Sequence, residues 1–328
     1  MAAGTTDPLA RLESALRAGA DAPRRQMLII VNPYASTVSE RLKHLVVYAL
    51  RGSYRVKAVE TESRDHATEL VRDAAREGYD AVVAFGGDGT VNEVANGLAG
   101  SGTPLTCLPG GRANVYCRIL GIPTDLVDAT EQLLRMADDW QPRAVDIGYV
   151  GDRKFLFSAG VGLDASVVRV VDAHPRLKQR FGEWYYASTA VRTFNRHYLV
   201  HPPRFEAELG EVRVTGVTTI VQNATPYTYF GERPVQLGEG ATLHSGDLSG
   251  VVLRRASPLD IPTLLWRALA RHPQFVRHRQ VHAFAGLGQL RVRSLDEQPL
   301  PLQVDGDFIG EVSSAEFGIL PGGLVVLC

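Results

Sequence analysis

Apolar and polar positions follow two different rhythms along this chain, and the change falls near Val145. Before it, apolar runs such as 27–31 and 81–85 alternate with segments whose apolar residues recur at offsets of three and four, as in 40–51. Uninterrupted apolar runs are typical of strands buried on both faces, and the offsets of three and four are typical of amphipathic helices. The pattern therefore predicts a parallel sheet covered by helices on both faces.

Beyond Val145 the pattern of apolar and polar residues predicts mostly antiparallel β structure. Strands are expected in six segments: 154–162, 204–209, 212–223, 248–255, 287–294 and 301–312. Helical stretches around 176–195 and 259–271 interrupt them. The predicted fold class is an N-terminal doubly wound parallel α/β domain followed by a mainly antiparallel, β-sandwich-like domain.

Boundaries follow from these patterns. Residues 1–24 are interpreted as a leader, either disordered or a short helix, and residues 25–144 as a nucleotide-binding α/β domain. Residues 145–317 are expected to form a β-rich domain that binds the acceptor, with 318–328 able to return to the first domain. The length of 328 residues agrees with two domains, at roughly 150 residues each.

Composition excludes several classes of protein. With 45% apolar and 22% charged residues the chain is an ordinary globular protein, and 35 basic against 36 acidic residues give no overall attraction to nucleic acid. Three distant cysteines indicate neither a disulfide framework nor a zinc site. Without a signal peptide or a membrane-spanning run, a cytoplasmic protein is expected.

The sharpest local signal is the glycine-rich segment 85–94, FGGDGTVNEV, between a buried strand and a helix. Glycines at this junction let a ligand approach the backbone, and the N-terminus of the helix favours phosphate. Asp88 would repel a bare phosphate, so it suggests bound Mg²⁺ or a base that acts on a hydroxyl. The plain alternative is a tight turn in which the glycines only save space.

Residues 86–98, GGDGTVNEVANGL, resemble the nucleotide loop of the diacylglycerol kinase catalytic domain superfamily, which includes bacterial lipid kinases, sphingosine kinases and ceramide kinases. Further segments match in family order: Asn32-Pro33, Thr61 with His66-Ala67, 108–123, 158–168, 229–231 and 304–311. The resemblance implies ATP as the phosphoryl donor, Mg²⁺ as cofactor and a lipid hydroxyl, diacylglycerol-like, as acceptor.

The resemblance also assigns residues. It implies that the nucleotide contacts Asn32, Thr61, Gly86, Gly87, Asp88, Gly89, Thr90, Asn92, Gly111, Arg112 and Asn114. Most of these follow strands and should gather at the carboxyl edge of one sheet. Asp88 and Asp307 are expected to handle metal or proton. Asp164 is expected near the acceptor hydroxyl or head group, unless it only caps a helix at 165–171.

Three departures from the family pattern keep other functions open. The second phosphate loop ends in Val115 where the family has a carboxylate, and Asp307 replaces a longer glutamate. Ser245 and Ser249 stand where many bacterial members have metal-linked aspartates, which leaves Asp247 as the candidate metal ligand. The alternatives are a catalytically impaired kinase-fold protein that binds lipid or nucleotide, and an NAD-kinase-like enzyme.

One segment of this nearly neutral chain is strongly basic. Residues 263–293 contain six arginines and three histidines and no acidic residue. With Trp266, Phe275 or Phe284 nearby, this surface could hold the protein against anionic lipid. The alternative is a solvated helix face followed by an exposed edge strand. A homodimer is also open, and no nucleic-acid partner is expected.

Overall fold

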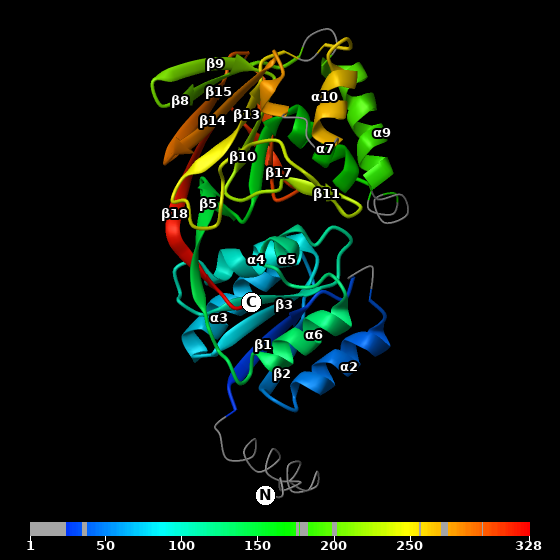
Figure 1. Ribbon diagram of the computed structural model, residues 1–328, viewed down its shortest axis with the longest axis vertical. Coiled ribbons are helices and arrows are strands. Elements are labelled where there is room, and N and C mark those ends of the chain that lie inside the picture. The colour runs from blue at the N-terminus through cyan, green and yellow to red at the C-terminus, as the bar shows by residue number, and fades with distance from the viewer. Residues whose placement is uncertain are drawn as a thin grey trace, which may run out of the picture.

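The computed structural model describes residues 24–34, 38–174, 177, 183–198, 202–255, 257–269, 275–296 and 298–328. Nearly all of the expected leader, 1–24, lies outside these residues. Figure 1 shows two domains stacked along the long axis of the molecule. Among the described residues, no helix is both long and apolar enough to cross a membrane.

The first domain is built on a parallel sheet with the strand order β2-β1-β3-β4. Its strands are β1 (Gln26–Val31), β2 (Arg55–Glu60), β3 (Ala81–Gly86) and β4 (Leu105–Pro109). Every residue of β3 and β4 is buried, as expected for central strands covered on both faces.

Helices cover both faces of this sheet. They are α2 (Glu40–Leu50), α3 (His66–Glu77), α4 (Asp88–Leu98), α5 (Val115–Ile119) and α6 (Leu126–Arg135). α3 packs against α4, and α2 packs against α6 (Figure 1). The apolar positions that predicted α3, such as Ala67, Val71 and Ala74, are its buried face.

The second domain has two layers of mainly antiparallel strands. One sheet has the order β14-β13-β10-β7-β16-β17. Its strands are β7 (Ser158–Gly162), β10 (Thr218–Gln222), β13 (Leu248–Leu253), β14 (Val281–Leu287), β16 (Leu300–Val304) and β17 (Asp307–Val312). The other layer contains β5 (Arg143–Val150), β6 (Arg153–Phe155), β8 (Phe205–Leu209), β9 (Val212–Gly216), β15 (Gln289–Ser294) and β18 (Ser314–Val326). A buried cluster that includes Phe155, Phe205 and Phe317 contains side chains from both layers.

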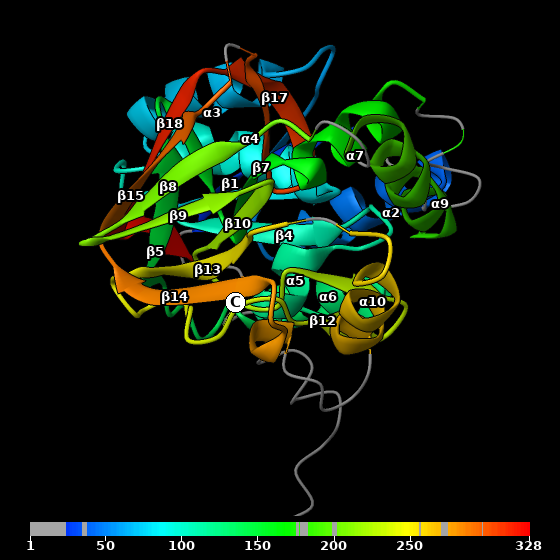
Figure 2. The same cartoon turned by 90° about the horizontal axis from the view of Figure 1, so that it is seen from above.

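Helices and a short hairpin lie together on one side of the two sheets of the second domain (Figure 2). The helices are α7 (Leu163–Asp172), α9 (Glu183–Thr193) and α10 (Ile261–Leu269). The hairpin consists of β11 (Thr228–Phe230) and β12 (Arg233–Val235).

Strand β18 joins the two domains. It pairs antiparallel with β15 in the second domain and with β5 along most of its length. At its end Val326 lies opposite Leu105 in a parallel pairing with β4, and the Leu327 N–H donates to the Leu105 carbonyl at 2.8 Å. One ten-stranded sheet therefore runs through both halves of the molecule.

The predicted fold class is confirmed, whereas several predicted strands are divided. The segment 154–162 forms β6 and β7, and 212–223 forms β9 and β10, which are separated at Val217. The segment 301–312 is a hairpin of β16 and β17 that turns at Asp305 and Gly306, both with positive φ. Helix α6 and strand β14 were not predicted, and part of the expected helix 176–195 lies outside the described residues.

Candidate active site

Two glycine-rich loops touch at the carboxyl edge of the first sheet. The Gly110 N–H donates to the Gly86 carbonyl at 2.9 Å. A Cβ on Gly111 would lie 2.7 Å from Cα of Gly87, and one on Gly87 would lie 3.3 Å from Cα of Gly111. Because this approach involves backbone on both sides, side chains cannot be accommodated here. The two loops thus form one bare backbone surface.

This surface lies at the N-terminus of α4. Gly87 is the N-cap and supplies no side-chain hydrogen bond to the first turn of the helix. The first N–H groups of a helix have no partner within it, and the helix dipole adds positive potential there. The junction therefore has the properties of a site for an anion such as phosphate.

Polar side chains brace the two loops. The Asn32 amide donates to Thr90 Oγ1 at 3.0 Å, and its Oδ1 accepts from the Tyr34 N–H at 2.9 Å. The Asn114 amide donates to the Gly111 carbonyl at 2.7 Å and its Oδ1 accepts the Gly111 N–H at 2.9 Å. Asn32 and Asn114 hold backbone in place, and Arg112 is exposed at the loop surface.

Thr61 and Val115 occupy different surroundings from those loops. Thr61 follows β2, and its N–H donates to the Val31 carbonyl at 2.9 Å, which places it at the same sheet edge as Asn32. Val115 begins α5 and is buried in the core of the first domain.

Two carboxylates border Gly89 in the first turn of α4. Asp88 Oδ1 accepts the Tyr116 N–H at 3.0 Å, which ties α4 to α5. Asp307, the first residue of β17, belongs to the second domain, and its Oδ2 lies only 2.8 Å from the point where a Cβ of Gly89 would sit. The structure thus brings both predicted catalytic residues to the start of α4, one from each domain.

The hairpin that carries Asp307 is fixed from both sides. Arg64, before α3, donates to the Phe308 carbonyl at 2.9 Å. Asp172 at the end of α7 accepts the Phe308 N–H at 3.0 Å. The position of Asp307 therefore depends on contacts with the first domain as well as with its own.

Asp305 is a site residue to which the sequence reasoning gave no role. Its buried carboxylate accepts the N–H groups of Leu156, Phe157 and Ser158 at 2.7 to 3.0 Å and the Asn92 amide at 2.7 Å. Burial raises the pKa of Asp305 to about 6, although these four donors favour the charged form. The only signal in the sequence was its place in the Asp305-Gly306-Asp307 turn.

Asn92 is the partner of Asp305 across the domain junction. Its amide donates to the Asp305 carboxylate and, at 3.0 Å, to the Lys154 carbonyl, and the Asn96 amide donates to Asn92 Oδ1 at 3.1 Å. The Asn92 side chain is buried. The structure therefore places this predicted nucleotide contact between the domains and bonded to protein.

Asp164 lies in the first turn of α7 and is linked to the same hairpin. Its carboxylate accepts the Tyr227 hydroxyl at 2.5 Å and the Gln303 amide at 2.8 Å, while Gln303 Oε1 accepts the Gly306 N–H at 2.9 Å. Burial raises the pKa of Asp164, and the bonds from Tyr227 and Gln303 oppose this shift. Asp164 is therefore connected through Gln303 to the residue before Asp307.

Asp247 lies apart from these groups. The nearby buried carboxylate of Asp146 accepts the Gly246 N–H at 2.7 Å and the Gly322 N–H at 2.8 Å, so it fastens this turn to β18. Throughout the part of the chain that the structure describes, no three His, Cys, Asp or Glu side chains are grouped to hold a metal ion. The metal role of Asp247 stays a prediction.

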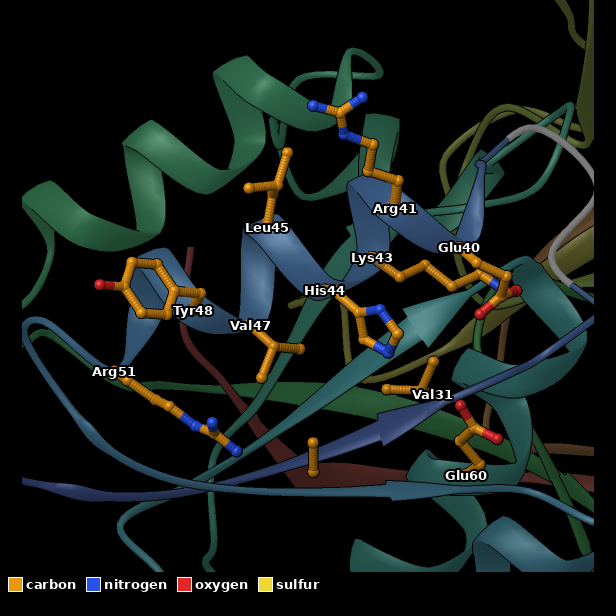
Figure 3. Close-up of a pocket in the computed structure, with 11 residues that line it drawn as sticks. Val31, Glu40, Arg41, Lys43, His44, Leu45, Val47, Tyr48, Arg51 and Glu60 are labelled. Atoms are coloured by element: carbon orange, nitrogen blue, oxygen red, sulfur yellow. The ribbon is translucent and has the colours of Figure 1, made fainter.

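A pocket of about 890 Å³, open to solvent, lies between α2 and strands β1 and β2 (Figure 3). His44 and Val47 point from α2 toward the sheet, and Val31 and Glu60 come from the carboxyl ends of the two strands (Figure 3). None of the predicted site residues lines it, although Val31 precedes Asn32 and Glu60 precedes Thr61.

Curated relatives carry kinase names. The probable lipid kinase YegS-like of Pseudomonas syringae pv. tomato is 32% identical over 180 residues, which is 54% of this chain and 56% of that protein, so the chain spans little more than half of its length. The diacylglycerol kinase of Staphylococcus haemolyticus is 25% identical over 298 residues, 88% of this chain and 84% of the relative.

Solved structures share the fold. A putative diacylglycerol kinase from Bacillus anthracis str. Sterne aligns with a TM-score of 0.72 at 20% identity, over 94% of this chain and 98% of the other. An NAD kinase from Archaeoglobus fulgidus in complex with ATP aligns with a TM-score of 0.51 at 10% identity, over 92% and 94%. Residues 26–150 match the family model of the diacylglycerol kinase catalytic domain. Residues 26–150 are therefore similar to a diacylglycerol kinase catalytic domain, which confirms the resemblance drawn from the sequence.

Proposed function

We propose that this protein is a lipid kinase that transfers the γ-phosphoryl group of ATP to the hydroxyl of a diacylglycerol-like acceptor. The observation that supports this function best is the position of Asp307 against Gly89. A carboxylate from the second domain there meets a bare backbone surface at the N-terminus of α4. This pairing suits a reaction in which a bound phosphate is attacked by a hydroxyl that must lose its proton.

The two glycine loops would bind ATP, the phosphoryl donor. Backbone N–H groups at Gly87 and Gly89 and the N-terminus of α4 would hold the phosphates of ATP. Asn32, Thr61 and Thr90 would position the nucleotide along the sheet edge, and the exposed guanidinium of Arg112 would contact a phosphate. The open pocket between α2 and strands β1 and β2 reaches this edge at Val31 and Glu60, and the nucleoside would lie there.

The carboxylates at Gly89 fit a magnesium ion carried with the nucleotide. Mg²⁺ is usually bound by one or two protein carboxylates together with substrate phosphates, so a cage of three protein ligands is not required. Asp88 is the residue that would hold it, next to the phosphate surface. When bound, the ion would neutralise charge on the phosphates during transfer.

Asp307 would act on the acceptor. Its carboxylate would take the proton of the acceptor hydroxyl while the hydroxyl oxygen bonds to the γ-phosphorus, and ADP would leave with the bridging oxygen. Asp164, held by Tyr227 and Gln303, would bind the head group of the acceptor. Catalysis would come mainly from positioning and from neutralising charge.

The test is a transfer assay on purified protein. Labelled ATP and Mg²⁺ are incubated with diacylglycerol, monoacylglycerol, sphingosine, ceramide and phosphatidylinositol in mixed micelles, and separately with NAD. We expect one lipid to be labelled, and Asp88→Asn and Asp307→Asn to lower the rate by about 100-fold or more. The matched control is Asp73→Asn on the exposed side of α3, which should leave the rate unchanged.

Two results would contradict the proposal. Binding of ATP without transfer to any lipid would favour the non-catalytic kinase-fold protein. The altered positions behind that alternative are Val115, Ser245, Ser249 and Asp307. Transfer to NAD alone would favour an NAD-kinase-like enzyme. Circular dichroism and melting temperature of each variant must match those of the wild type for its rate to be compared.

A further inference from the structure

Helix α10 and Leu259 in the turn before it form an exposed apolar face on the second domain. Large side chains are open to solvent there: Leu259 is 84% exposed, Trp266 64% and Leu265 48%. The opposite side of the same helix is also apolar, since Leu264 is buried and Ile261 packs against the same cluster. A helix with apolar residues on both sides normally has a second partner.

We propose that this face is the membrane anchor of the protein and lies in the head-group region of an anionic bilayer. The inference rests on the proposed function, because only a lipid acceptor requires the enzyme to work at a bilayer. Trp and Leu on an exposed helix face are the side chains that enter this boundary region.

The charge around the face suits anionic lipid. Between Arg254 and Gln280 the chain has six arginines and a single acidic residue, Asp260. Asp260 is buried and its carboxylate accepts the Arg279 guanidinium at 2.7 Å, so its negative charge is neutralised. Arg254, Arg255 and Arg277 are exposed. Each basic side chain near an anionic surface adds to binding.

The packed side of α10 lies near the predicted acceptor site. Ala268 of α10 packs against a cluster that also receives Tyr227, and the Tyr227 hydroxyl donates to Asp164. α10 also contacts strand β12 of the short hairpin, and Figures 1 and 2 both show α10 on the side of α7 and α9. An anchor at α10 would thus hold the predicted acceptor site, with Tyr227 and Asp164, close to the bilayer.

A second copy of the chain is a less suitable partner for this face. In a two-fold dimer each patch meets its own copy, so the exposed arginines would face arginines. The only carboxylate in this stretch, Asp260, is already bonded to Arg279. The positive charge around the apolar residues therefore favours a negatively charged lipid surface over a self-association.

The experiment measures sedimentation with sucrose-loaded vesicles in the absence of ATP. The wild type should bind vesicles of phosphatidylcholine with 30% phosphatidylglycerol by about 10-fold more than vesicles of phosphatidylcholine alone. The double variant Leu265→Ser with Trp266→Ser, and Leu259→Ser by itself, should each reduce binding by about 10-fold or more. The matched control is Val127→Ser on α6, which is 60% exposed on the first domain and should bind as the wild type does.

Binding without ATP keeps this inference separate from the proposed kinase activity. A protein that binds vesicles through α10 but transfers no phosphate would support the anchor and contradict the kinase. The anchor would be overturned if the wild type bound neither vesicle, or if the variants bound as well as the wild type. It would also be overturned if sedimentation velocity revealed a dimer that the double variant dissolves.

Discussion

Gly89 is a residue at which the two domains approach each other closely. A Cβ there would lie 2.8 Å from Asp307 Oδ2, so Gly89→Ala must push the carboxylate away from the start of α4. The obstacle is the end of a side chain, and the fold should therefore survive. We expect kcat with the lipid acceptor to fall by about 10- to 100-fold, because reacting groups tolerate little displacement.

The control for that variant is Gly288→Ala, since a Cβ on Gly288 meets nothing within 4 Å. Both proteins should melt close to the wild-type temperature, and only Gly89→Ala should lose activity. An unchanged kcat for Gly89→Ala would show that Asp307 does not need its observed position.

Asp305 makes the stability of the protein depend on pH. Burial raises the pKa of this carboxyl from 3.8 to about 6, so the folded protein binds the proton more tightly than the unfolded chain does. The resulting stabilisation is fully present below about pH 3.8 and is lost as the pH rises through about 6. Its size is about 3 kcal/mol.

Asp305→Asn removes this titration, and other titrating groups cancel when the two proteins are compared. The free energy of unfolding of the wild type minus that of the variant, measured by urea denaturation, should decrease by up to about 3 kcal/mol from pH 4 to pH 7. An increase over that range would mean that the four N–H donors outweigh burial.

Single residues were predictable where their chemistry forms a motif. Asp88 and Asp307 could be singled out because each belongs to a short run of glycine and aspartate, and their catalytic role stays a prediction. The role of Asp305 could not be predicted, because its four hydrogen-bond donors come from residues that lie far away in sequence. Asn92 differs from both, because its motif predicted a contact with the nucleotide. In the structure its side chain is instead bonded to protein groups across the domain junction.

At the scale of elements, the contact between α3 and α4 depends on Gly97. A Cβ at this position would overlap Val71 Cγ2 and would lie 2.7 Å from the Thr68 carbonyl oxygen. Because backbone is part of the obstacle, Gly97→Ala must separate the helices. We expect a loss of about 2 kcal/mol in the free energy of unfolding, measured by urea denaturation. Gly288→Ala again supplies the baseline, and equal stability of the two variants would refute the close packing.

Helices and strands whose apolar residues recur at one clear spacing were predicted. Where the spacing was mixed, the boundaries of the elements were not predicted. The run 212–223 mixes apolar and polar residues and was interpreted as one strand, although the chain leaves one sheet for the other at Val217. Helix α6 had a readable signal, since Asp125 accepts the Val127 and Asp128 N–H groups as an N-cap. Pairing partners such as β15 with β8 depend on contacts between distant segments and carry no local signal.

On the scale of the whole molecule, β18 couples the stability of the two domains. Val326 is fully buried where β18 pairs with β4, and the same strand pairs with β15 in the second domain. Val326→Ala should lower the free energy of unfolding by about 2 kcal/mol. Both domains should lose stability to the same extent, because they share one sheet.

Hydrogen exchange followed by mass spectrometry can test this coupling. Peptides that cover β3 and β15 should lose protection together in Val326→Ala. Loss of protection in β3 alone would mean that the first domain unfolds independently of the second.

The course of β18 also sets an order of events during synthesis. The first sheet takes its strands from residues 26–109 and then from 314–326. While the second domain is being made, the edge of β4 has no strand beside it and is open to pairing with other chains. A ribosome must therefore produce the whole second half before the first half is closed, and delay in that interval exposes the newly made chain to aggregation.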